Sequence, residues 1–178
     1  MIALCSAILR ATHALPTGGG YRWPVANDPG ASGTTRDLQH NGARILRSNG
    51  ATFCSGITFE AWWSVVADLP AIRALSLTEI RALQRDWYVA GEGRCGPVDA
   101  LVPRGLGVVV TDPRRAIPGD LAQLWRSNGT GHTVVLLHCD GERVAYWSSQ
   151  AATNGVGIHV EAMPRELHIV RPVVAEGI

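Results

Sequence analysis

Hydrophobic positions in the first half of the chain recur at the three- and four-residue spacing of a helix. One such segment begins directly after Cys54, and Pro70 closes it. Its apolar positions are Phe59, Trp62, Val66 and Leu69. A second segment begins at Ser76, which forms a capping box with Glu79, and Gly91 ends it. Its apolar stripe consists of Ile80, Leu83 and Trp87. The pattern therefore predicts two helices between residues 54 and 91.

The start of the chain, residues 1–14, is also apolar, and a helix is the favoured interpretation. A signal peptide is the alternative, but the segment lacks a basic leading region and Arg10 interrupts its apolar stretch. Residues 16–33 are rich in Gly, Pro, Asn, Asp and Thr, which predicts a long loop of the kind that often binds ligands.

After Gly105 the pattern changes to short runs of β-forming residues. The predicted strands are 108–111, 121–125, 132–139, 144–149, 157–161 and 167–173. Asp140 and Gly141 give a tight turn between the third and fourth of these, which is a strong hairpin signal. Helices followed by antiparallel strands indicate an α+β fold. Because no linker or repeat divides the chain, we expect residues 1–178 to form a single domain.

Composition and charge narrow the classes of function. The chain is 46% hydrophobic and 17% charged, which suits a globular core and argues against disorder. A formal net charge of +1 gives no broad footprint for nucleic acid, and no apolar run is long enough for a membrane span. Four cysteines permit disulfides but show no zinc spacing, so we expect no metal, no cofactor and a monomer.

Cys54 is the first candidate for chemistry because it directly precedes a predicted helix. Unpaired N–H groups and partial positive charge at a helix N-terminus favour a thiolate and can face a developing oxyanion. The small residues Ser55 and Gly56 would leave space for substrate. The alternative is a buried structural cysteine, since free cysteine is among the most buried residue types.

His132 is the second candidate, at the start of a predicted strand. A nucleophilic thiol needs a nearby base in a fixed orientation, and a strand end is a rigid position for one. The alternative is an ordinary polar residue at a strand start. Among the tryptophans, Trp62 and Trp63 are expected in the core, whereas Trp23 and Trp147 are better candidates for a substrate cleft.

Taken in order, these signals resemble the NlpC-type peptidases, a papain-like family of bacterial cell-wall hydrolases. The matching pieces are Cys54-Ser55-Gly56, the Pro-Gly-Asp-Leu segment 118–121, Gly131-His132 leading into 134–137, and the entry segment 20–23. The resemblance covers residues 18–158. Two features depart from the family pattern. Phe53 stands where the family usually has Asp, and the stretch between Tyr21 and Cys54 is longer than usual.

The resemblance implies a papain-like fold with Cys54 as nucleophile, His132 as base and a third polar residue that orients the histidine. It also implies that Tyr21 helps to form the oxyanion site together with backbone N–H groups near Cys54. No organic cofactor or metal is implied. The implied substrate is a peptide, specifically a peptide bond in peptidoglycan stem peptides.

The third polar residue follows from strand pairing. A three-residue hairpin loop sets Cys139 opposite Arg143 and Gln150 opposite His132, with Ser148 as a diagonal neighbour on the same face. A two-residue loop would set Ser149 opposite His132 instead. We favour Gln150, whose amide oxygen can accept from an imidazole N–H, with Ser148 and Asn154 behind it as further contacts in the site. The alternative is that residues 148–154 are only a polar loop.

The leading hypothesis is therefore a cysteine peptidase or amidase that hydrolyses an amide bond through a thioester acyl-enzyme. The same Cys and His could instead serve an acyltransferase. A third hypothesis is a non-catalytic module that binds a peptide or glycan. A cell-wall substrate would require an extracellular or periplasmic location, but the sequence carries no clear export signal, so the compartment stays open.

Overall fold

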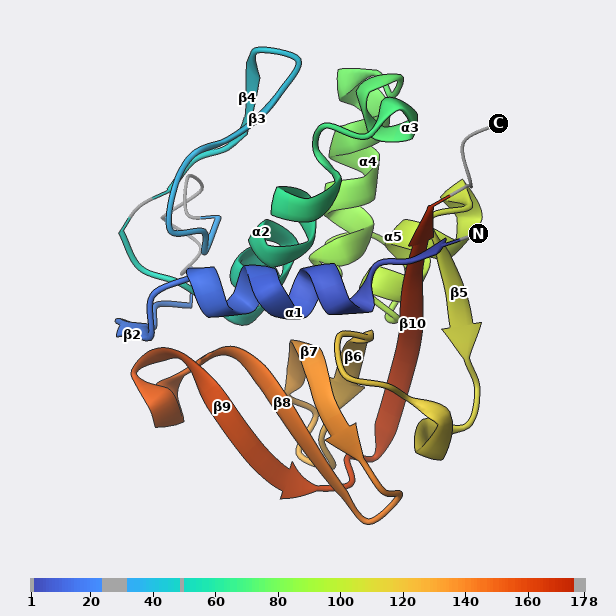
Figure 1. Cartoon of the computed structure of the whole chain (residues 1–178). Coiled ribbons are helices and arrows are strands. Elements are labelled where there is room, and N and C mark those ends of the chain that lie inside the picture. Colours follow the sequence, from blue (N-terminus) through green and yellow to red (C-terminus); the bar gives the residue numbers. More distant parts are fainter. Residues whose placement is uncertain (1, 24–31, 49, 175–178) are drawn as a thin grey trace.

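The computed structural model describes residues 2–23, 32–48 and 50–174. Helices lie mainly in the first part of the chain and an antiparallel sheet is built mainly from the second, so the prediction of an α+β fold is confirmed (Figure 1). The helices are α1 (Cys5–Ala14), α2 (Cys54–Val66), α3 (Pro70–Arg73), α4 (Leu77–Trp87) and α5 (Pro97–Leu101). The strands are β1 (Ile2–Ala3), β2 (Gly18–Gly19), β3 (Leu38–His40), β4 (Ala43–Leu46), β5 (Gly107–Val110), β6 (Leu121–Trp125), β7 (Gly131–Cys139), β8 (Arg143–Gln150), β9 (Gly155–Ala162) and β10 (Glu166–Val174).

The main sheet has the strand order β1-β10-β6-β7-β8-β9-β2, and β5 pairs with β10 beside β1. Neighbouring strands in it are antiparallel. Short connections join β6, β7, β8 and β9 in sequence, whereas β10 returns to the far side of β6. Strand β10 therefore connects the consecutive strands to the N-terminal strand β1.

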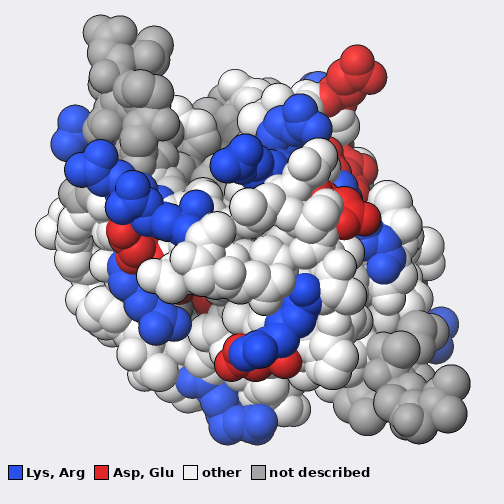
Figure 2. Space-filling view, turned by 90° about the horizontal axis from the view of Figure 1, so that it is seen from above, with Lys and Arg blue, Asp and Glu red and all other residues white. Residues whose placement is uncertain are grey.

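Arginine and acidic side chains are distributed over the surface that carries α3, α4 and the β3–β4 hairpin. Figure 2 shows this surface with basic groups beside acidic ones in some places and among uncharged atoms in others. In the described part of the chain, no helix is long and apolar enough to cross a membrane. The four cysteines form no disulfide.

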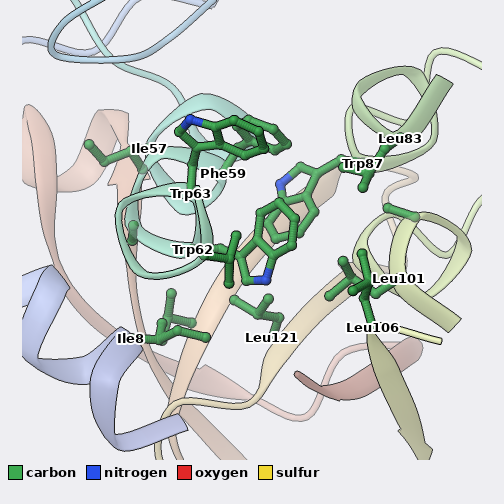
Figure 3. Packing of buried hydrophobic residues seen from close by; sticks show 14 of the residues in the cluster. Ile8, Ile57, Phe59, Trp62, Trp63, Leu83, Trp87, Leu101, Leu106 and Leu121 are labelled. Carbon is green, nitrogen blue, oxygen red and sulfur yellow. The ribbon is translucent and has the colours of Figure 1, made fainter. Parts of the chain in front are cut away.

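The core lies between the helices and one face of the sheet. Trp62 and Trp63 are buried there, as predicted, and they pack with Phe59 and Trp87 (Figure 3). The ring centroids of these aromatic pairs lie 5.3–5.9 Å apart, a range in which such contacts add about 0.5–1.5 kcal/mol beyond area burial. Trp147 belongs to this core at 7% exposure, so the structure corrects its assignment to a substrate cleft.

The ends of the predicted helices differ from the observed ones. Helix α2 ends at Val66, and Pro70 does not close it but begins α3, because proline is accepted in the first turn of a helix. Helix α4 has the predicted capping box at Ser76. It ends at Trp87 and not at Gly91, and Val89 has a left-handed conformation at φ 53°. Residues 5–14 form the helix expected near the start of the chain.

The Pro-Gly-Asp segment anchors three parts of the chain to one another. Asp120 is fully buried, and both its carboxylate oxygens accept hydrogen bonds of 2.9 Å from Arg171 on β10. The Cys5 thiol of α1 donates to the same carboxylate at 3.3 Å. A Cβ on Gly119 would collide with the Cys5 backbone, so this close approach needs glycine. The segment therefore fixes α1 against the sheet.

Candidate active site

Cys54 is the first residue of α2, as its sequence context predicts. The residue is only 3% exposed. A Cβ on Gly56 would collide with the backbone of Ser32 and Gly33. Gly56 is therefore needed because the two stretches of backbone approach each other closely. The expectation that its small size leaves space for substrate is corrected.

The sulfur of Cys54 lies beside the strand that carries His132. The backbone of Thr133 and the side chain of Ser55 hydrogen bond to the sulfur, and Ser55 Oγ lies 3.8 Å from it. Ser55 Oγ is also 3.2 Å from Thr133 Oγ1, which donates to Gln123 Oε1 at 2.8 Å. These hydrogen bonds attach the start of α2 to β7 and β6.

Burial determines the resting charge state of Cys54. Desolvation raises the pKa of its thiol, while the hydrogen bonds from Thr133 and Ser55 lower it by less. The helix N-terminus was expected to favour a thiolate, yet its effect is at most about 2 kcal/mol. Desolvation can shift a fully buried group by about 3–5 pKa units. The resting sulfur is therefore a thiol at neutral pH, and the expected thiolate is corrected.

His132 is 5% exposed. It is the second residue of β7, at the end of the strand nearest α2. Burial is the main cause that lowers the pKa of its imidazole to about 3, and the positive charge of Arg126 adds to the effect. Glu161 and a hydrogen bond with the Gln150 side chain oppose it. The imidazole is therefore neutral, and its Nε2 has no hydrogen-bond partner in the described part of the chain. A neutral ring nitrogen of this kind can take up a proton.

Gln150 meets His132 through the predicted strand pairing, although the predicted loop is wrong. Cys139 pairs with Val144, so the connection is one residue longer than the three-residue loop. A register shift between Leu136 and His138 then restores the expected pairing, and Leu136 faces Tyr146. Continued to the end of the strands, this register sets Gln150 opposite His132. Ser149 lies on the other parity and contacts Thr52, with 2.6 Å between the two hydroxyl oxygens.

A polar network extends behind Gln150 and was not predicted. The Tyr146 hydroxyl is 3.1 Å from Gln150 Oε1 and 3.0 Å from Glu161 Oε1, but it has one proton to donate. Arg126 donates to Glu161 through Nε at 2.7 Å and Nη2 at 2.9 Å, and to the Tyr146 oxygen at 3.1 Å. The Tyr146 ring lies 5.5 Å from that of His132. Three side chains from β8, β9 and the β6–β7 connection thus support the Gln150 amide.

These network residues carried weak sequence signals. Tyr146 precedes Gln150 by an even number of residues on β8, so both side chains lie on the same face of the strand. The alternation of side chains could therefore have indicated Tyr146 as a neighbour of Gln150. Arg126 lies in the connection between β6 and β7, and Glu161 lies on β9. Their meeting depends on the order of strands in the sheet, which periodicity alone does not determine.

A cavity of about 190 Å³ joins the two candidate catalytic residues. Its lining includes Cys54, Ser55, His132, Thr133, Trp23, Tyr88, Val89 and Trp125. Trp23 is 54% exposed at this cavity, in line with its assignment to a cleft. A left-handed φ is strained for a β-branched residue such as Val89, and strain of this kind clusters at functional sites.

Tyr21 and Ser148 occupy different positions relative to this cavity. Tyr21 forms a bridge with Thr52, two residues before Cys54. Burial raises the pKa of Tyr21, and a negative charge on Cys54 would raise it further, but Tyr21 does not line the cavity. Ser148 is fully buried and donates to the Thr133 carbonyl at 2.7 Å. Ser148 therefore supports the pairing of β7 and β8, and its expected contact with substrate is corrected.

Two further observations limit the chemistry and the ancestry that can be assigned. Among the described residues, no cluster of His, Cys, Asp or Glu could hold a metal ion. Comparison with protein-family models and with curated proteins finds no match for this chain. The geometry of the site itself is therefore the basis for any functional assignment.

Proposed function

We propose that the chain is a cysteine hydrolase of the NlpC type with a papain-like fold, and that Cys54 and His132 cleave an amide bond. The observation that carries the proposal is the cavity shared by Cys54 at a helix start and His132 at a strand start, with Gln150 hydrogen bonded to the imidazole. Nucleophile, base and orienting group are the three parts that such a reaction needs.

The proposed reaction begins from a neutral thiol and a neutral imidazole. Sγ of Cys54 attacks the carbonyl carbon while His132 takes the thiol proton. N–H groups at the start of α2 and the Tyr21 hydroxyl stabilise the oxyanion. The C–N bond then breaks, and His132 gives its proton to the leaving amine. Water, deprotonated by His132, attacks the resulting thioester, which releases the acid and restores the thiol.

Gln150 acts in this proposal as a positioning residue. Its amide oxygen accepts from the imidazolium N–H that forms when His132 is protonated. Tyr146 can at that moment turn its proton to Glu161, because both acceptors lie within hydrogen-bond distance of its hydroxyl. The network would thereby support the positive charge that burial otherwise disfavours on His132.

The substrate class rests on the resemblance of Cys54-Ser55-Gly56, 118–121 and Gly131-His132 to cell-wall peptidases. We propose peptide bonds of peptidoglycan stem peptides on that basis. In the described part of the chain no acidic side chain lines the cavity, and Phe53 occupies the position usually held by Asp. The substrate group next to the scissile bond therefore need not carry a positive charge.

The test is mass spectrometry of muropeptides after incubation with the purified protein. Wild type should release new amine termini, and Cys54→Ala should remove that activity while the circular dichroism spectrum stays unchanged. Cys139→Ala is the matched control, because Cys139 is buried elsewhere, with its sulfur 3.9 Å from that of Met163. Equal activity of Cys54→Ala and wild type would exclude Cys54 as nucleophile. Release of free acid without an added nucleophile indicates hydrolysis, whereas turnover that begins only when an amine or alcohol is supplied would indicate acyl transfer.

One observation favours a second candidate function, a peptide- or glycan-binding module without catalysis. Burial raises the pKa of Cys54 and lowers that of His132, so both groups are uncharged at rest. If the chain is such a module, wild type and Cys54→Ala immobilised on a column should retain muropeptides equally well. Neither protein should change the masses of the muropeptides.

A further inference from the structure

A second hollow lies on the outer side of α4, away from the Cys54 sulfur. It has a volume of about 600 Å³, which is within the range of about 300–1,000 Å³ that small-molecule sites occupy. Its walls are mainly apolar and are formed by Leu46, Ala82, Tyr88 and Ala90. We call this hollow the α4 groove. Tyr88 lines both the α4 groove and the cavity of Cys54.

Two arginines border the α4 groove without a counter-charge among the residues that the structure describes. Arg81 and Arg85 are both exposed, line the groove and lie one helical turn apart on α4. Neither forms an ion pair or side-chain hydrogen bond within the described part of the chain. Like charges at this spacing repel each other and destabilise a helix. An anion between them would remove that repulsion, and the guanidinium fork suits a carboxylate.

A buried amide provides the second, independent sign of a ligand. Gln84 lies between the arginines in sequence, lines the α4 groove and is 8% exposed. Its Nε2 has no hydrogen-bond partner among the residues that the structure describes. A buried unsatisfied donor destabilises the fold, so a native structure usually has a reason to retain it. Rotation of the Gln84 amide toward the groove would let a ligand oxygen supply the missing acceptor.

From these three features we propose that the α4 groove binds an amphipathic carboxylate, a carboxylate group carried on an unbranched apolar chain. The carboxylate pairs with Arg81 and Arg85 and accepts from Gln84, and the chain lies against Leu46, Ala82 and the Tyr88 ring. This site is separate from the proposed peptidase reaction and does not depend on it.

Isothermal titration of the full chain with decanoate and with decan-1-ol tests the proposal. The two probes have the same apolar chain, so decanoate should bind at least about tenfold more tightly, which corresponds to one net ion-pair gain of about 1.4 kcal/mol. Arg81→Gln with Arg85→Gln should abolish that difference. Arg10→Gln with Arg143→Gln removes the same charge from exposed positions elsewhere and should preserve it. Equal binding of the two probes to wild type would overturn the proposal, as would an undiminished preference for decanoate in the Arg81 and Arg85 double variant.

Gln84→Leu separates a ligand contact from a structural role. Leucine removes the unsatisfied donor, so the variant should unfold at a higher urea concentration than wild type. It should also bind decanoate several-fold more weakly, because the acceptor interaction is lost. A variant that is more stable and binds decanoate as well as wild type would refute the assignment of Gln84 to the site.

Discussion

The pH dependence of Cys54 alkylation tests the electrostatics of the site directly. Burial raises the pKa of this thiol above the ordinary value of 9.0. Only the thiolate reacts with iodoacetamide, so at pH 7 at most about one molecule in 100 is reactive. The rate should therefore rise about tenfold per pH unit from pH 7 to pH 9, without a plateau.

The assay follows the four cysteines separately in one native protein. All 16 basic residues are arginines, so trypsin cleaves at positions that place each cysteine on its own peptide. Residues 48–73 carry Cys54 alone, and residues 95–104 carry the half-exposed Cys95 as an internal comparison. Timed alkylation, quenching, digestion and mass spectrometry then give a rate for Cys54 at each pH.

A Ser55 variant checks which contacts determine the alkylation rate of Cys54. Ser55→Ala removes a hydrogen bond that lowers the pKa of Cys54, so alkylation at pH 8 should become slower. Ser64→Ala on the exposed side of the same helix is the control and should have no effect. A Cys54 rate that stays constant between pH 6 and pH 8 would refute the reasoning. It would mean that a thiolate–imidazolium pair forms in spite of burial.

Four further predictions concern catalysis and stability. His132→Ala should lower turnover of a muropeptide substrate by a factor of about 10² to 10⁴, measured by steady-state kinetics, and no loss would exclude it as the base. Gln150→Ala should lower turnover by less and leave Cys54 alkylation intact; a loss as large as that of His132→Ala would show a more direct role. Because the pKa of His132 is lowered to about 3, protonation should inhibit activity only near that pH, and an acid limb centred near pH 6.5 in the kcat/KM profile would contradict the neutral pair. Arg171→Met should lower the free energy of unfolding in urea by about 3–5 kcal/mol because it leaves the carboxylate of Asp120 buried without its partner, and a loss under about 1 kcal/mol would show that the pair matters little.

The elements that sequence predicted best are those governed by local signals. The start of α4 was identified correctly because Ser76 and Glu79 cap each other within one turn. A short run of β-forming residues likewise located β6 at residues 121–125. The β3–β4 hairpin was not predicted, although Asn41-Gly42 between its strands is a strong turn signal and Asn41 has a left-handed φ of 48°. Residues 24–31 of the predicted loop lie outside the described residues.

The candidate site was predictable in position but not in electrostatics. Cys54 and His132 stand out because Cys54 begins α2 and His132 is the second residue of β7, and such ends are recognisable in sequence. Gln150 was found through two offsetting features, a loop one residue longer than expected and a register shift near Leu137. The raised pKa of Cys54 depends on how completely the folded chain covers its sulfur. That cover is a tertiary contact, which hydrophobic periodicity does not reveal.

The position of β10 has a consequence for how the chain folds. Val170 pairs with Val109 on one side and Leu121 on the other, and Val173 pairs with Ala3. These strands are far apart in sequence, so β10 can pair with them only after most of the chain has been synthesised. Contacts between such distant segments slow folding. Until β10 arrives, β6 presents a free edge to other chains, and an unpaired edge invites aggregation. We therefore expect a ribosome-bound chain that ends before residue 166 to depend on chaperones. In such a chain Asp120, which contacts α1 through Cys5, still lacks its ion pair with Arg171.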